Sequence, residues 1–212
     1  MMGKLKKLTG YRLFLPLSCL IIVLLINLIT TPTFFRITIN NGVLYGYIID
    51  VINRASELVV LAVGMTLVVS ASAGTDISVG AVMAVAAAVC TRVLAGGEVS
   101  VNEYANPYVL AVLAALAAAV VCGGFNGLLV AKLKIQPMVA TLILFTAGRG
   151  ISQLVTNGQI TYIRVDGYKL LGNNIPGIPI PTPIFVAVIV VALTYILLKK
   201  TAMGMYIQSV GI

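Results

Sequence analysis

Long apolar blocks separated by short polar stretches dominate this chain. A block of about 18 or more apolar residues is typical of a membrane-spanning helix, because about 20 residues at ~1.5 Å each cross a hydrocarbon core of ~30 Å. The second and third blocks are the most interrupted. The pattern predicts an all-α integral membrane protein with about six transmembrane helices, at residues 12–31, 55–73, 77–95, 108–131, 138–156 and 182–198.

The composition agrees with this prediction. Of the 212 residues, 60% are hydrophobic and 9% are charged, whereas a typical soluble domain has about 25% charged residues. The formal net charge of +8 would suggest a nucleic-acid partner for a soluble protein. Here the basic residues cluster at helix ends, and no long polar face is left to bind a nucleic acid. We therefore expect the lipid bilayer as a partner and no nucleic acid.

The charged residues also predict the orientation, because the cytoplasmic loops of membrane proteins are enriched in Lys and Arg. With both the N-terminus and the C-terminus in the cytoplasm, the inner side receives eight basic residues: Lys4, Lys6, Lys7, Arg12, Lys132, Lys134, Lys199 and Lys200. The outer side receives Asp50, Glu57, Glu98, Glu103 and Asp166. Asp76 is the one acidic residue that does not follow this distribution.

Several kinds of site are excluded by the residue types. Histidine is absent, which removes Ser-His-Asp triads and histidine metal sites. Cys19, Cys90 and Cys122 lie far apart within apolar blocks, without metal-ligand spacing. No Gly-x-x-x-x-Gly-Lys-Ser/Thr sequence is present. We therefore expect no catalytic residue, no metal and no cofactor. If transport is driven by ATP, a separate protein must bind the ATP.

The fourth apolar block contains the clearest packing signal. Small residues recur every four positions and form one stripe along a helix: Ala111, Ala115, Ala119, Gly123, Gly127 and Ala131. Membrane helices approach one another closely along such stripes. We expect this stripe to pack against another helix of the same chain, with a dimer contact as the alternative. Asn126, on the same helix, either bonds to a neighbouring helix or lines a polar path.

The segment Ala73-Gly74-Thr75-Asp76-Ile77-Ser78-Val79-Gly80 is the most polar interruption of the apolar blocks. A carboxylate on a helix at mid-bilayer costs about 2.5–3.5 kcal/mol, and it is better tolerated where a helix begins. There Asp76 could cap the third helix by accepting a hydrogen bond from the backbone N–H of Ser78 or Val79. Alternatively, a broken helix lines a polar pathway, as in many transporters. The two interpretations are compatible.

Arg149 lies in the fifth block, between Gly148 and Gly150. An arginine near the outer interface can extend its charged group to the membrane surface. In the alternative interpretation Arg149 faces a water-filled cavity, with Thr146, Gln153 and Asn157 as polar neighbours. Such donors and acceptors would suit the hydroxyl groups of a sugar.

Several motifs follow one another between Leu61 and the end of the chain: Gly64–Val69, Asp76–Met83, Asn126–Val130, Lys134–Leu142, Gly148–Gly150 and Thr156–Ile160. In this order they resemble the permease subunits of bacterial ABC importers for monosaccharides, the ribose/galactose-type branch. That family usually has a second glycine and an apolar residue where Ala73 and Thr75 stand here. Lys134–Leu142 and Arg149–Ile160 are most similar to permeases assigned to galactofuranose uptake.

The resemblance implies a permease subunit in the bacterial inner membrane that forms the path for a monosaccharide. Its implied partners are a periplasmic sugar-binding protein, a second permease subunit and two cytoplasmic ATP-binding subunits. The substrate-pathway candidates are Asp76, Ser78, Asn126, Thr141, Arg149, Gln153 and Asn157. The segment after residue 200 is similar to the start of the ATPase-contacting region, with the candidates Gly204, Met205, Gln208 and Gly211.

In the family, an alanine-rich stretch and further membrane helices should follow this segment. We therefore expect the chain to be the N-terminal part of a longer permease, and we expect 212 residues alone not to couple ATP hydrolysis to transport. Two alternatives are a free-standing six-helix channel or facilitator and a non-functional fragment. An intramembrane enzyme is disfavoured, because Asp76 is the only acidic residue between Glu57 and Glu98, which leaves no second aspartate there for a two-aspartate protease, and because histidine is absent.

Overall fold

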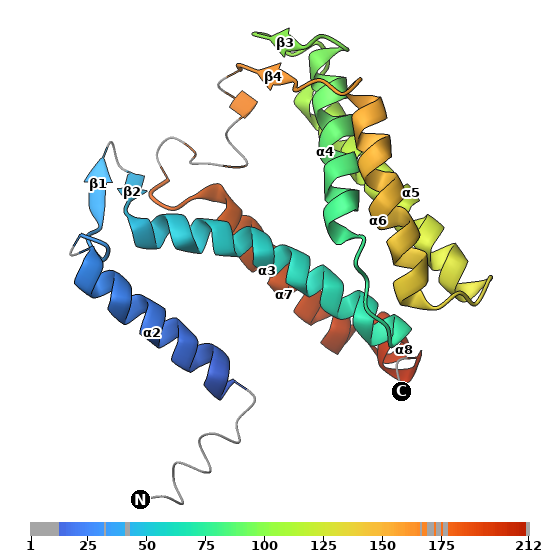
Figure 1. Ribbon diagram of the computed structural model, residues 1–212, viewed down its shortest axis with the longest axis horizontal. Coiled ribbons are helices and arrows are strands. Elements are labelled where there is room, and N and C mark those ends of the chain that lie inside the picture. Colours follow the sequence, from blue (N-terminus) through green and yellow to red (C-terminus); the bar gives the residue numbers. More distant parts are fainter. Residues whose placement is uncertain are drawn as a thin grey trace, which may run out of the picture.

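The computed structural model describes residues 13–31, 33–40, 43–165, 167–168, 172, 175 and 178–210. Helices make up most of this part of the chain (Figure 1): α2 (Phe14–Thr30), α3 (Tyr47–Ser72), α4 (Val79–Ala95), α5 (Tyr108–Ala131), α6 (Pro137–Val155), α7 (Thr182–Lys200) and α8 (Ala202–Val210). The strands are short: β1 (Thr38–Asn40), β2 (Val43–Tyr45), β3 (Ser100–Val101) and β4 (Tyr162–Ile163).

Each of the six predicted spans corresponds to one of the helices α2 to α7. Four of them, α3, α5, α6 and α7, are long and apolar enough to cross a membrane, and α2 and α4 are shorter apolar helices of 17 residues. The predicted start of the second span near residue 55 is wrong, because α3 begins at Tyr47. Asp50 lies in the first turn of this helix, where a carboxylate interacts favourably with the helix dipole. The polar positions between residues 47 and 54, which suggested a loop, therefore belong to the helix.

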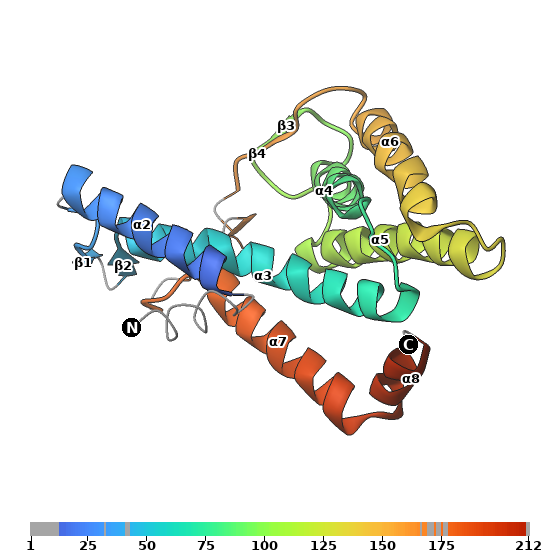
Figure 2. The same cartoon turned by 60° about the horizontal axis from the view of Figure 1, so that its bottom comes forward.

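The helices pack in two groups (Figure 2). In one group α4 packs against both α5 and α6; in the other, α3 packs against α7 and α8. No residue of α2 is buried. Because α3 and α4 follow each other in the chain, the short segment between Ser72 and Val79 connects the two groups.

Small side chains bring α4, α5 and α6 together. Val85, Cys122 and Leu144 form a buried cluster, one residue from each helix. A Cβ atom added to Gly148 would lie 3.1 Å from Cβ of Ala81, which shows how closely α6 approaches α4. Membrane helices associate through such close contacts because lipid is as apolar as the helix surfaces.

The small-residue stripe of α5 packs within the chain only in part. Ala111 is completely buried. By contrast, Gly123, Gly127 and Ala131 are exposed, and an added Cβ at either glycine would meet no other atom within 4 Å. Within the described residues, packing inside the chain is therefore seen only for part of the stripe, and a dimer contact along the remainder stays the alternative prediction. Asn126 and Leu129, which are buried, face the neighbouring helices instead.

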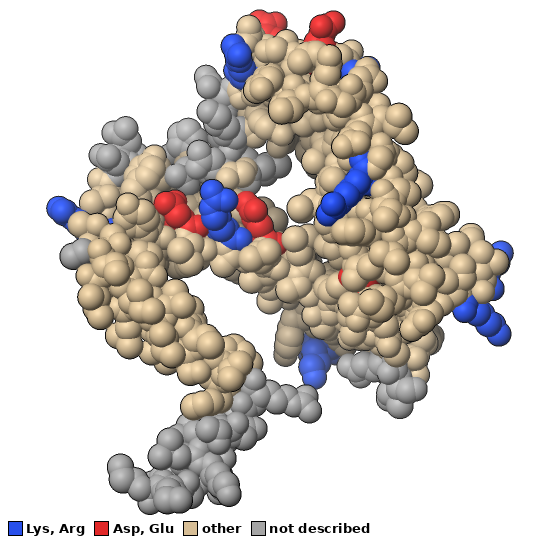
Figure 3. Space-filling view, viewed as in Figure 1, with Lys and Arg blue, Asp and Glu red and all other residues tan. Residues whose placement is uncertain are grey.

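The connections at the start of α5 and the end of α6 are joined by a small parallel sheet. Ser100 pairs with Tyr162 and Val101 with Ile163. The visible surface is mainly uncharged (Figure 3), and many large apolar side chains are exposed, such as Val120 and Leu154. An exposed apolar surface of this extent is expected of a protein that lies in a lipid bilayer.

Candidate functional site

The segment between α3 and α4 turns the chain without a regular helix. Ala73 ends α3 in the left-handed conformation, with φ of 51°, and its N–H donates to the carbonyl oxygen of Val69. Left-handed backbone is costly for a residue with a Cβ atom and almost free for glycine. A glycine in place of Ala73 would therefore relieve local strain at this position.

This strain makes the effect of Ala73→Gly predictable. We expect the free energy of unfolding to rise by about 1 kcal/mol, because glycine adopts the left-handed conformation without the Cβ clash. Thermal unfolding of the chain in detergent would measure the change. The matched control is Ala62→Gly in the interior of α3, which should lower stability by about 0.5–1 kcal/mol. An equal loss for both variants would contradict the assignment of strain to Ala73.

The carboxylate of Asp76 lies just before α4 and bonds to Ser78. Oδ1 of Asp76 accepts hydrogen bonds from the backbone N–H of Ser78 and from its hydroxyl group, each at 2.7 Å. The expected bond from the Ser78 N–H is therefore present. Ser78 itself occupies the N-cap position, and α4 begins at Val79. The carboxylate also lies close to the positive, N-terminal end of the α4 dipole.

Two further helices contribute polar groups to the same place. Nδ2 of Asn126 on α5 donates to Oγ of Ser78 at 2.9 Å. Oγ1 of Thr141 on α6 accepts from the N–H of Ile77 at 3.3 Å. Ser78, Asn126 and Thr141 are all buried, whereas Asp76 is partly exposed. We call the four residues Asp76, Ser78, Asn126 and Thr141 the polar cluster. It ties together the starts of α4 and α6 and the inner half of α5.

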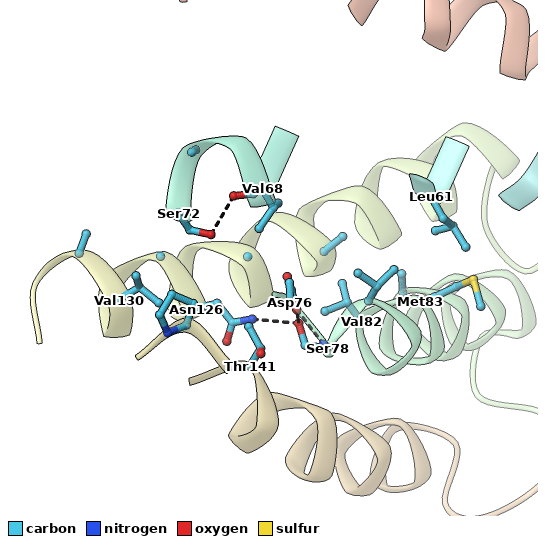
Figure 4. A pocket seen from close by; sticks show the side chains of 18 of the residues that line it. Leu61, Val68, Ser72, Asp76, Ser78, Val82, Met83, Asn126, Val130 and Thr141 are labelled. Carbon is cyan, nitrogen blue, oxygen red and sulfur yellow. Dashed lines mark hydrogen bonds between the residues drawn. The ribbon is translucent and has the colours of Figure 1, made fainter. Parts of the chain in front are cut away.

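The polar cluster lines a cavity of about 820 Å³. In Figure 4, Asn126 points toward Ser78, and Ser78 toward Asp76, while apolar residues such as Leu61, Val82 and Met83 form other parts of the wall. Gly123, Gly127 and Ala131 also line this cavity, so the small-residue stripe widens it. Within the described residues, Oδ1 of Asn126 has no hydrogen-bond partner.

The other predicted pathway residues lie elsewhere. Gln153 lines a separate groove between α4 and α6. The guanidinium group of Arg149 lies 4.5 Å from the ring centroid of Phe145, in a cation–π contact. Asn157 has a positive φ of 53° and forms the turn after α6. Arg149 and Asn157 line neither the cavity nor this groove. Of the seven pathway candidates, four therefore form the polar cluster and Gln153 lines the separate groove, whereas Arg149 and Asn157 belong to neither place.

The predicted ATPase contacts fall on α8 and beyond it. Gly204 is buried against the end of α7, where an added Cβ would clash with the backbone of Leu198. Met205 is 68% exposed. Gln208 belongs to α8, but its side chain lies outside the described part of the chain, as does all of Gly211. Val210 at the end of α8 lines the same cavity as the polar cluster.

Comparison with known proteins agrees with this architecture. The galactofuranose transporter permease protein of Escherichia coli (strain K12) is 43% identical over 196 residues, which cover 92% of this chain and 54% of the relative. The fructose import permease protein of Bifidobacterium longum (strain NCC 2705) is 37% identical, over 98% of this chain and 57% of the relative. The ribose import permease protein of Escherichia coli (strain K12) is 32% identical, over 92% and 57%.

The predicted resemblance to monosaccharide permeases is thus confirmed. The chain spans a little over half the length of these relatives. No solved structure matches it significantly. Residues 47–212 match the family described as branched-chain amino acid transport system / permease component. The chain therefore belongs to this family of transport permeases and is a multi-pass protein of the bacterial inner membrane.

Proposed function

We propose that this chain is part of the transmembrane permease of an ATP-driven importer and forms the path of a monosaccharide across the inner membrane. The observation that carries the proposal is the polar cluster in an otherwise apolar cavity of about 820 Å³. Buried polar groups in a membrane are costly, and they mark substrate paths in many transporters. The relatives that resemble this chain are named as sugar permeases, which supports a sugar as the substrate.

The polar cluster has the chemistry that a sugar needs. Within the described residues, both hydrogen bonds to the carboxylate of Asp76 go to Oδ1. Oδ2 therefore remains available to accept a bond from a sugar hydroxyl, and a charged acceptor makes a stronger bond than a neutral one. Valine, leucine and methionine side chains in the wall offer apolar surface to the C–H face of a sugar ring. Galactofuranose is the first substrate to test, because the relative with 43% identity is named for it.

The remaining parts of the importer are supplied by other subunits in this proposal. The sequence contains no phosphate-binding loop, so cytoplasmic ATP-binding subunits bind and hydrolyse ATP. A periplasmic sugar-binding protein delivers the substrate, and a second permease subunit completes the path. The position of α8 supports contact with the ATP-binding subunits, because this helix follows Lys199 and Lys200 at the predicted cytoplasmic end of α7.

The test is uptake of radiolabelled galactofuranose by cells that contain the complete transporter, with and without this permease. We expect uptake that depends on both the permease and the ATPase activity of its partner. Ribose and fructose serve as alternative substrates. Flux of a sugar through liposomes that contain the chain alone, without ATP, would instead support the free-standing facilitator. No uptake of any of the three sugars would contradict the proposal.

A further inference from the structure

In the described part of the chain, a further polar cavity lies between the outer ends of α4 and α6. It is a groove of about 280 Å³, near the lower limit of about 300 Å³ that is usual for small-molecule sites. Its floor consists of alanines of α4, and its walls carry six polar side chains: Thr91, Ser152, Gln153, Thr156, Gln159 and Thr161. We call it the outer groove. Gln153 lies 12 residues after Thr141 on α6, so the outer groove is about 18 Å from the polar cluster along that helix.

A tight turn after α6 builds the outer groove. Asn157 and Gly158 both have positive φ, at 53° and 67°, and the N–H of Gly158 donates to the carbonyl oxygen of Gln153 at 2.7 Å. The chain thereby reverses, and Gln159 and Thr161 come to line the groove. The pairing of β4 with β3 then holds this connection in place. Asn157 thus acts as a turn residue, and Gln159, which the sequence did not suggest, occupies the groove.

The hydroxyl groups in the outer groove are mainly acceptors. Thr91 donates to the carbonyl oxygens of Ala87 and Ala88 on its own helix. Ser152 and Thr156 likewise donate to carbonyl oxygens of α6. A hydroxyl that has used its only proton in this way still has a lone pair to accept a further bond.

The two glutamine amides complete the hydrogen-bonding capacity of the groove. Each supplies two N–H donors and one carbonyl acceptor. In the described part of the chain, the side chains of Gln153 and Gln159 make no hydrogen bond, and both are exposed. Among the described residues, none that lines the groove is charged. Its surface therefore offers neutral donors and acceptors side by side, and this matches a molecule whose hydroxyl groups both donate and accept.

We propose that the outer groove is a subsite for a neutral monosaccharide, occupied before the sugar reaches the polar cluster. This inference rests on the proposed function. It adds that the sugar is first bound by the neutral hydrogen-bonding groups of the outer groove. A sugar acid is disfavoured here, because its carboxylate would lose water without gaining a cationic partner. At the polar cluster, by contrast, the charged carboxylate of Asp76 accepts a hydrogen bond from the sugar.

The test measures protection of a cysteine in the groove. Ile160 lines the outer groove and is 71% exposed, so Ile160→Cys in the whole chain, reconstituted in lipid nanodiscs, provides a thiol at its rim. Labelling by a membrane-impermeant maleimide is followed with increasing galactose, and the chain without this substitution gives the background from Cys19, Cys90 and Cys122. We expect galactose to slow the labelling and galacturonate to leave it unchanged.

The glutamine amides are tested in the same background. Combined Gln153→Ala and Gln159→Ala should raise the galactose concentration for half-protection about tenfold, since two neutral hydrogen bonds are lost. Gln136→Ala, at the opposite end of α6, is the matched control and should leave the galactose concentration for half-protection unchanged. Absence of protection by galactose, equal protection by galacturonate, or an unchanged half-protection concentration in the double variant would each overturn the inference. Uptake by the complete transporter, measured separately, shows whether the proposed function fails as well.

Discussion

Asp76→Asn is expected to lower sugar uptake by the complete transporter about tenfold to 100-fold while the permease still assembles. An asparagine side-chain oxygen can accept the same two bonds from Ser78 that Oδ1 of Asp76 accepts now, each at 2.7 Å. The start of α4 should therefore keep its structure. The negative charge and the second acceptor are lost, and a hydrogen bond to a charged group contributes about 1.5–3 kcal/mol. That loss corresponds to the expected decrease in uptake.

Two measurements separate a role in the path from a structural role. The amount of assembled transporter in the membrane and the rate of labelled sugar uptake are compared for Asp76→Asn and Asp76→Ala. Alanine also removes the bonds to Ser78, so only this variant should lower assembly. Glu103→Gln, at an exposed position in the outer loop, serves as the control for loss of one negative charge. If Asp76→Asn assembles and transports normally, the carboxylate does not bind the sugar.

Gly74→Ala is expected to destabilise the protein by about 1–3 kcal/mol, the usual cost of overpacking. An added Cβ at Gly74 would lie 2.6 Å from Cβ and 2.7 Å from Cγ of Pro137. The proline ring is rigid, and Pro137 is the first residue of α6, so relief requires the connection between α3 and α4 to move away from α6. That movement would also displace Asp76 from its place between the helices.

The matched control is Gly64→Ala in the interior of α3, where an added Cβ would meet no atom within 4 Å. Alanine favours helix over glycine by about 0.8–1.0 kcal/mol, so this variant should be at least as stable as the wild type. Thermal unfolding in detergent compares the two variants. Similar stability of Gly74→Ala and Gly64→Ala would show that α6 does not constrain the connection as the structure indicates.

The positions of the helices could be read from the sequence with few errors. An uninterrupted apolar block fixed α5 at Tyr108–Ala131, as predicted. The start of α3 was missed because Asp50 and Arg54 break the apolar pattern, although both are exposed on the helix. The bond between Asp76 and Ser78 was also predictable, since it joins residues two positions apart. A structural feature that depends only on residues close together in the sequence can therefore be predicted from the sequence.

The meeting of distant residues was decided only by the tertiary structure. Asn126 bonds to Ser78 across 48 positions, and Thr141 bonds to Ile77 across 64. Gln159 enters the outer groove because the turn at Asn157 reverses the chain. In a soluble protein, the apolar stripe of a helix indicates which face is buried. In a bilayer, the helix faces toward lipid and toward other helices are equally apolar, so apolarity does not indicate which face is buried. The sequence therefore determines where the helices lie in the chain and which polar groups they carry. The packing of the helices determines which of these polar groups come into contact.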